Sequence, residues 1–445
     1  MKNGMFFYFV IIGVVVCMVS QASAKEREKK ITITPWGWMT MGEVVKSTFI
    51  DGDVYADDTT DIGRKKYAYS SNYWHFDFAE TWIIYTDMGL RVQAPAGDKS
   101  DITVHAGARI AFNTVLKENK SEQETRNFMR SFIPYPIETS LFTRHLDAEK
   151  VKLSTKLGYF SFKYNPDVRN LGEYLFRSGA YPPIVVSGFD IADKTKILGL
   201  QTRLSLFDNL HQDFFVHSEI QRYPVYDFSL SYLVNYTPNK LFDIGAGISF
   251  SHLISVDEEK TTPGIKAAGR ITIDPKALFD MPIFGEEDLK LYTEAAVLGI
   301  KDYPVFYDDI RKRIPVMVGF NIPAFNILDV CALEVEYFPN DFSNSENHIW
   351  QQSVPIPFTG EAKPAAYGEV NKYPFPQRDD WKWSLFAVKS VGEVGEIIAQ
   401  AASDHTWRKY VTTGKAGWLL GLGDEELCQS PLDWYWMLRF KFYLK

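Results

Sequence analysis

The sequence predicts an all-β fold, a transmembrane antiparallel β-barrel of about sixteen strands, on three observations. Residues 433–445 alternate strictly, with an apolar aromatic face against a polar, charged face. Segments with this two-residue period recur along the chain, and the connections between them alternate in length. Because strand ends are the least certain part of such a prediction, about fourteen or about eighteen strands remain alternatives.

The chain opens with the features of an export signal. Lys2 precedes an apolar run over residues 5–19, and Ala22-Ser23-Ala24 matches a small-residue cleavage site. We therefore expect residues 1–24 to be a cleaved signal peptide and residues 25–445 to form a single barrel domain. The apolar run is short for a membrane-spanning helix, which favours cleavage over a retained anchor.

Composition narrows the class of protein. The chain is 46% hydrophobic and 15% aromatic, with a formal net charge of −8, which argues against nucleic-acid binding. After the signal, no apolar stretch is long enough for a membrane helix. A barrel with a polar lumen and polar loops has such a composition, but so does a large soluble all-β protein. The strand pattern therefore has to decide between them.

The alternating segments are taken in chain order, and several have one apolar and one polar face. The clearest block is the four segments from 195–206 to 241–254; in the last of them Phe242, Ile244 and Ile248 alternate with small or polar residues. The expected strands cover residues 34–49, 73–93, 101–112, 146–156, 157–165, 195–206, 210–221, 226–236, 241–254, 264–273, 288–299, 314–321, 327–338, 381–390, 393–402 and 433–445.

The connections carry a second, independent signal. Connections after even-numbered strands are mostly short, and those after odd-numbered strands are mostly long, such as 113–145 and 339–380. Short periplasmic turns that alternate with long external loops are typical of outer-membrane barrels. Two connections break the rule, since 222–225 is short where a long loop is expected and 274–287 is long where a turn is expected.

A barrel of about sixteen strands is wide enough to enclose water. By the alternation, the side chains that face inward are polar, and basic residues outnumber acidic ones, so we expect a weak anion preference. The alternative, that some of these charges lie at the rim or in internal ion pairs, stays open. The candidate pore-lining residues are Arg91, Arg109, Lys150, Lys152, Lys163, Arg203, Lys266, Arg270, Lys290, Glu294, Glu334, Glu336, Arg439 and Lys441.

These patterns together resemble the outer-membrane porins of Gram-negative bacteria, over the whole mature chain and without a short diagnostic motif. The resemblance implies an outer-membrane location, contact with its lipid, passive diffusion of small polar solutes, and a homotrimer. The chain departs from the family by ending Tyr443-Leu444-Lys445 and not on an aromatic residue. It also lacks a known constriction motif, so the resemblance does not identify a subfamily.

The resemblance also implies that the third external loop, here residues 166–194, folds into the lumen and sets its aperture. A short helical turn over 170–177 is expected to end before Pro182. Arg169, Glu173 and Arg177 are the candidate constriction residues, because their charges would lie across the pore. A loop packed on the external rim is the alternative.

The remaining motifs are weak. The acidic stretch 51–61 lacks the spacing of a calcium loop, and the histidines and cysteines show no metal-ligand spacing, so we expect no metal or cofactor. Asp404-His405 has no visible nucleophile, so we expect no enzyme. A substrate-specific transporter, or a structural or adhesive barrel plugged by its long loops, are the alternatives to a porin-like channel.

Overall fold

The computed structural model describes the strands and most of the short connections of the chain. It describes residues 31–50, 73–78, 81–115, 130–176, 195–219, 227–254, 264–279, 281–300, 309–339, 380–403, 407–411, 422–426 and 433–444. Within these residues no helix has the length and apolar character to cross a membrane.

The strands run the length of the described chain. They are β1 (Thr32–Ile50), β2 (Tyr73–Phe78), β3 (Thr81–Pro95), β4 (Ser100–Val115), β5 (Arg130–Asp147), β6 (Val151–Phe162), β7 (Thr195–Leu206), β8 (Leu210–Glu219), β9 (Asp227–Asn239), β10 (Phe242–Ile254), β11 (Gly264–Ile273), β12 (Leu291–Val297), β13 (Val316–Asn321), β14 (Val330–Tyr337), β15 (Trp381–Val391), β16 (Gly395–Ala402), β17 (Trp407–Val411), β18 (Leu422–Glu426) and β19 (Asp433–Tyr443). Two 3₁₀ turns accompany them, η1 (Pro275–Leu278) and η2 (Ile310–Arg313).

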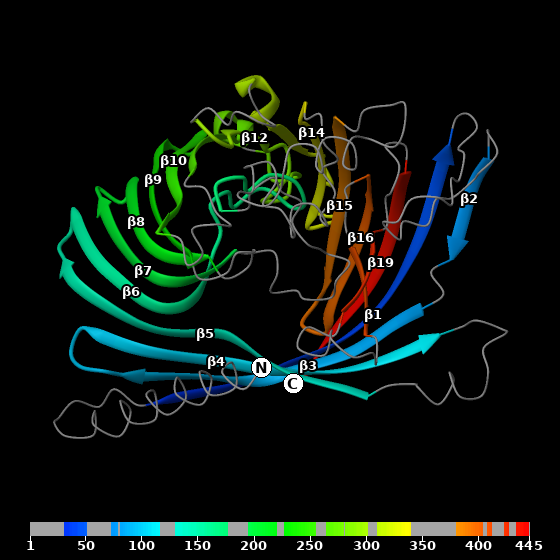
Figure 1. The fold of residues 1–445 in the computed structure, drawn as a ribbon, viewed down its shortest axis with the longest axis horizontal. Helices are drawn as coiled ribbons and strands as arrows, with labels where there is room; N and C mark the ends of the chain where they lie inside the picture. The colour runs from blue at the N-terminus through cyan, green and yellow to red at the C-terminus, as the bar shows by residue number, and fades with distance from the viewer. Residues whose placement is uncertain are drawn as a thin grey trace.

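The main sheet closes on itself. Neighbouring strands pair antiparallel around the sheet, and the last strand, β19, pairs with β16 on one side and β1 on the other. Segments β2 and β3 pair with successive stretches of β1, so the barrel has 16 strands with β2 as an additional outer strand. Figure 1 shows these strands running around a central space. The predicted all-β barrel and its strand number are confirmed.

One part of the predicted strand order is wrong. The expected strands 146–156 and 157–165 are largely one strand, β6, and β5 lies where a loop over 113–145 was expected. Within β6, Gly158 has φ 131°, and an added Cβ there would meet the carbonyl of Thr139 at 2.2 Å. Pro136 of β5 lies beside a bulge in the β4–β5 pairing, where a strand tolerates a proline.

The prediction had one strand too many at β6 and missed β5, so the number of strands before β7 is unchanged. Short and long connections therefore alternate in the predicted order. The connection after β6 is the third of the long series, and both exceptions to the length rule are real. One hairpin was not expected: β17 and β18 pair with each other within the long connection between β16 and β19.

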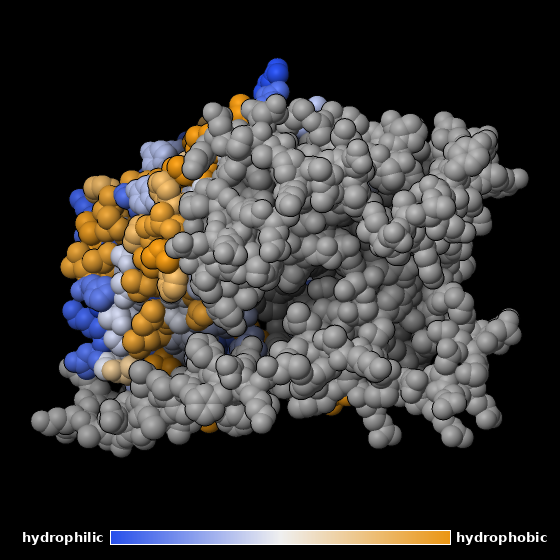
Figure 2. Space-filling view, viewed as in Figure 1, coloured by the Kyte–Doolittle hydropathy of each residue, from blue (hydrophilic) through white to orange (hydrophobic). Residues whose placement is uncertain are grey.

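The barrel has a polar inside and an apolar outside. On β11, Lys266 and Arg270 are buried inside, whereas Ile244 and Phe250 of the neighbouring strand β10 face outward and are exposed. Figure 2 shows apolar side chains gathered on the visible outer wall over β6–β10. A soluble protein buries its apolar side chains, so this inverted arrangement indicates a wall that stands in an apolar medium.

Candidate functional site in the barrel lumen

The chain after β6 turns into the barrel. We call residues 163–176 the inward segment; Figure 1 shows it as the teal coil in the central space. Its apolar side chains are almost completely buried, with Leu171 and Leu175 at 0% exposure and Tyr174 at 1%. The predicted loop over 166–194 therefore has at least its first part inside the barrel and not on the external rim.

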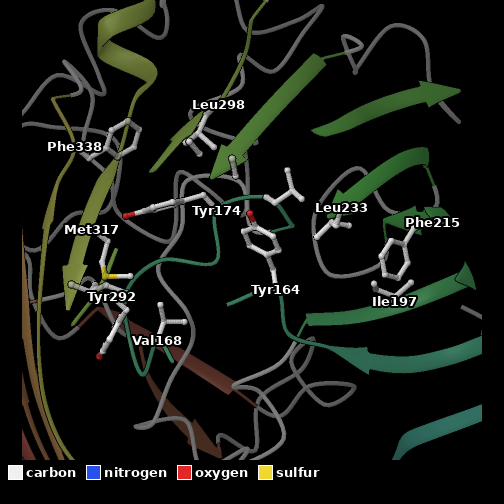
Figure 3. Packing of buried hydrophobic residues seen from close by; sticks show 14 of the residues in the cluster. Tyr164, Val168, Tyr174, Ile197, Phe215, Leu233, Tyr292, Leu298, Met317 and Phe338 are labelled. Atoms are coloured by element: carbon white, nitrogen blue, oxygen red, sulfur yellow. The ribbon is translucent and has the colours of Figure 1, made fainter. Parts of the chain in front are cut away.

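Apolar contacts hold the inward segment to one side of the barrel wall. Phe176 lies 5.6 Å from Phe162 of β6 and 5.6 Å from Phe215 of β8, measured between ring centroids. Ile197 of β7 and Leu233 of β9 belong to the same buried cluster. Figure 3 shows that this cluster continues through Tyr164 and Tyr174 to side chains of the opposite wall, so the segment bridges the two walls.

Wall carboxylates hold the segment on the opposite side, and Glu334 of β14 makes the larger set of bonds. The backbone N–H groups of Arg169, Asn170 and Leu171 donate to its carboxylate oxygens at 2.5, 2.8 and 2.8 Å. The hydroxyl of Tyr292 on β12 adds a fourth bond at 2.9 Å. Glu334 is 1% exposed, so its carboxylate has lost its hydrogen bonds to water. The four donors supply hydrogen bonds in place of that water.

Glu294 of β12 binds the segment a few residues further on. The N–H groups of Glu173 and Tyr174 donate to it at 3.1 and 2.8 Å, and the side chain of Asn165 donates at 3.0 Å. Gly172 with φ 93° and Glu173 with φ 64° both adopt left-handed conformations. This geometry turns two successive N–H groups toward one anion, an arrangement known as a nest.

Glu173 stabilises the segment itself. Its carboxylate accepts hydrogen bonds from the backbone N–H groups of Tyr164 and Asn165, and the residue is only 2% exposed. The hydroxyl of Tyr174 donates to Glu336 of β14 at 2.6 Å. Burial raises the pKa of the Tyr164 hydroxyl, so this side chain stays neutral. The middle of the segment thus carries little charge that is open to solvent.

The tip of the segment reaches the connection between β11 and β12. Arg169 makes an ion pair with Glu287 at 2.6 Å, and Lys290 bonds to the same Glu287 at 2.7 Å. Asp167 accepts a hydrogen bond from the Thr272 hydroxyl at 2.5 Å. Arg169, Glu287 and Lys290 are partly exposed, and they form a chain of alternating charges at the short-turn end of the lumen.

Elsewhere on the inner wall, cations pair with acids of neighbouring strands. Arg109 of β4 makes two bonds to Asp87 of β3, at 2.9 and 2.7 Å, inside the wall. Four further pairs have the same form. They are Lys156–Glu138, Arg203–Asp213, Arg270–Asp243 and Lys441–Glu396. Each pair reduces the net charge that the inner wall presents.

The predicted pore-lining residues therefore fall into separate groups. Glu294, Glu334 and Glu336 face inward but are covered by the segment. Lys150 and Lys152 lie at the short-turn rim, where Lys152 bonds to Asp208 at 2.7 Å and both partners are exposed. This hydrogen bond lowers the pKa of the Asp208 carboxyl.

The other predicted residues are placed as follows. Lys163 follows β6 and donates to the carbonyl of Val168 at 2.8 Å, so it belongs to the segment and not to a strand. Arg91 shares the inward face of Asp87 on β3 and is exposed, and Arg439 on β19 is buried. Lys266 donates to the carbonyl of Leu175 at 3.4 Å. Arg177 lies outside the described residues, as do Asp404 and His405.

Sequence reasoning missed several residues that take part in the bonds between the inward segment and the wall. Asn165, Gly172 and Tyr174 were not singled out, and neither was Glu287 in the connection after β11. The only local signal is Gly172, since a glycine beside a charged residue often marks a left-handed turn. In the described part of the chain, no cluster of three or more histidine, cysteine or acidic side chains has metal-site geometry.

A closed antiparallel barrel of 16 strands, polar inside and apolar outside, with a segment folded into its lumen, defines a porin-like β-barrel. No protein-family model and no curated protein matches the chain.

Three solved structures illustrate the fold comparison. OmpF of Salmonella typhi in complex with daunomycin has a TM-score of 0.45 at 10% identity, over 93% of this chain and 97% of OmpF. A mutant of Rh. blastica porin has 0.41 at 8%, over 93% and 100%. A triple mutant of Rhodopseudomonas blastica porin has 0.40 at 8%, over 93% and 100%. The fold of this chain is defined by its own strand pairing, independently of these structures.

Proposed function

We propose that this protein is an outer-membrane channel for the passive diffusion of small hydrophilic solutes. The observation that carries the proposal is the inverted burial of the barrel, which has charged side chains inside and exposed apolar side chains outside. Such a wall suits lipid on its outer face and water within. The role needs no catalytic group and no cofactor.

The proposed solute path runs beside the inward segment, along the wall of β1, β3, β4, β16 and β19. On this wall Arg91 is exposed and Lys441 is partly exposed, Arg109 and Arg439 are buried, and the segment covers the wall of β12–β14 instead. The residues of the third long connection, with Arg169 at its described tip, limit the aperture in this proposal. The roles of Glu173, which is buried, and of Arg177 as charged constriction residues stay predictions.

A weak anion preference also stays a prediction. The ion pairs of the wall support a small preference over a large one, because acids lie beside three of the cations counted from the sequence, Arg109, Arg203 and Lys441. Reversal potentials across a salt gradient measure this directly. A cation preference would contradict it.

The accompanying proposals concern location and assembly. We infer that residues 1–24 are removed on export, that the barrel of residues 25–445 lies in the outer membrane of a Gram-negative bacterium, and that it contacts the lipid there. A homotrimer is a further prediction, which the mass of the detergent-solubilised protein tests.

The deciding experiment is the conductance of the refolded mature chain in a planar bilayer. Stable steps that scale with salt concentration are expected. Folded protein without conductance would contradict the channel. It would then favour a substrate-specific transporter or a structural barrel, for which the apolar cluster inside the lumen is the supporting observation.

A further inference from the structure

Two connections at the short-turn end of the barrel form one folded unit. They are residues 274–290, between β11 and β12, and residues 322–329, between β13 and β14. Asp288 joins them, since its carboxylate accepts hydrogen bonds from Gly285 N at 2.9 Å, Ala324 N at 3.1 Å and Phe325 N at 3.0 Å. Asp288 is 1% exposed, so a buried carboxylate with three N–H donors fixes the first connection against the second.

The conformation of this unit is specified in detail. Leu289, Phe325 and Asn326 all have positive φ values, 66°, 52° and 62°, although none is a glycine. The ring of Phe284 stacks on that of Phe325 at 5.6 Å between centroids, and Asn326 Nδ2 donates to the carbonyl of Ile283 at 3.2 Å. A barrel needs only a tight turn at these positions, so a long, strained and tightly bonded unit indicates a purpose beyond chain reversal.

The unit exposes large apolar side chains. They range from 48% exposure at Phe325 to 72% at Leu278 and Ile327. We call this set the apolar knob. Its members are Leu278, Met281, Ile283, Phe325 and Ile327. By contrast, the connection between β3 and β4 is a short turn of small and polar residues with an exposed Asp98.

The apolar knob continues the apolar outer wall. Cross-strand neighbours Ile273, Leu291, Phe320 and Leu333 form an outward row over β11–β14, next to the short-turn end. The chain passes from this row directly into the two connections that carry the knob. Continuity with a surface that suits lipid favours lipid as the occupant of the knob.

We propose that the apolar knob inserts into the membrane leaflet at the short-turn end of the barrel, among acyl chains close to the headgroups. This inference rests on the proposed membrane location. The physical reason is that burying these side chains in acyl chains removes apolar surface from water. Several backbone N–H groups of the unit, including those of Phe284, Phe325 and Ile327, are already hydrogen-bonded within it.

The test measures which medium surrounds the knob. Single-cysteine variants Ile283→Cys and Ile327→Cys are made in a Cys331→Ala, Cys428→Ala background, labelled with an environment-sensitive fluorophore, and reconstituted into phosphatidylcholine vesicles. Brominated acyl chains and aqueous iodide serve as the two quenchers. Leu157→Cys on the outward face of β6 is the control for lipid contact, and Asp98→Cys is the control for water contact.

The expected result is that both knob labels are quenched by brominated lipid to a similar extent as the Leu157→Cys label, and several-fold less by iodide than the Asp98→Cys label. Iodide quenching equal to that at Asp98→Cys would overturn the inference. A knob label shielded from both quenchers would also overturn it, because a protein surface would then cover the knob. If the Leu157→Cys label escapes brominated lipid, the proposed membrane location itself fails.

Discussion

The inward segment meets the two sides of the barrel wall through different chemistry. Toward β6–β9 it presents rings and aliphatic side chains, such as Phe176 against Phe215. Toward β12–β14 it adds to such apolar contacts the backbone N–H groups that donate to Glu294 and Glu334. Apolar contacts favour burial without demanding one position, whereas hydrogen bonds to a fixed carboxylate demand specific atoms at specific distances. The contacts with β6–β9 therefore favour burial of the segment, and the hydrogen bonds to β12–β14 determine its position in the lumen.

The largest expected effect comes from removing the carboxylate of Glu334. In Glu334→Ala, three backbone N–H groups and the Tyr292 hydroxyl lose their acceptor inside the barrel. At about 1–3 kcal/mol for each unsatisfied buried group, we expect a loss of about 5 kcal/mol in the free energy of unfolding. We also expect release of the segment, measured as new protease cleavage within residues 163–176.

The matched control is Glu138→Ala, which removes a wall carboxylate bonded to Lys156 and Ser140 and not to the segment. This variant should leave the segment protected from protease. Equal cleavage in the two variants would mean that the carboxylates of β12–β14 have no special part in placing the segment.

A smaller loss is expected from Gly172→Ala, on the same side. Residue 172 has φ 93°, and an added Cβ would lie 3.0 Å from Met317 Cε and 3.2 Å from Glu294 Oε2. We expect the free energy of unfolding in denaturant to fall by about 2 kcal/mol.

The loss in Gly172→Ala has two causes, the positive φ and the crowding of the added Cβ, and Gly392→Ala separates them. Gly392 has φ 56° in a short turn, with nothing within 4 Å of an added Cβ. It therefore carries the backbone penalty alone, and the additional loss at residue 172 measures the crowding against Glu294 and Met317. Identical losses would show that the nest tolerates a side chain.

The apolar side should respond more mildly to a change of shape. Phe215→Leu keeps an apolar side chain in the cluster but loses the ring contacts to Phe162 and Phe176, at 4.9 and 5.6 Å. We expect a loss of about 1 kcal/mol in unfolding free energy and no new cleavage in the segment. Cleavage as strong as in Glu334→Ala would reverse the roles assigned to the two sides.

The smallest effect concerns the carboxylate of Asp208 at the exposed short-turn rim, in contrast to the buried carboxylates. The hydrogen bond from Lys152 lowers the pKa of Asp208. A lowered folded-state pKa contributes stability above the unfolded pKa, and this contribution is lost as pH falls through the folded pKa. Lys152→Met should raise the pKa of Asp208 toward its usual range, measured by NMR titration of the carboxyl carbon. An unchanged pKa of Asp208 in Lys152→Met would exclude the hydrogen bond from Lys152 as the cause of the lowered pKa.

Much of the wall could be predicted from the sequence, because the two-residue alternation of a strand depends only on residues near each other in the chain. The inward faces of Glu294, Glu334 and Glu336 follow from it. The prediction failed at two neighbouring strands: β6, which was expected as two strands, contains Gly158, and β5, part of which was expected as a loop, contains Pro136 beside its bulge. Both residues are typical of turns, and both are accommodated by a neighbouring strand.

The all-β class, the two faces of most strands and the order of short and long connections can all be predicted from the sequence. What the inward charges do became visible only in the folded barrel. The N–H of Arg169 and the carboxylate of Glu334 are 165 residues apart, and no local pattern reports a contact of that kind. Closure of the barrel brings them together across the lumen, so carboxylates that alternation predicts as pore-lining instead hold a segment of the chain in place.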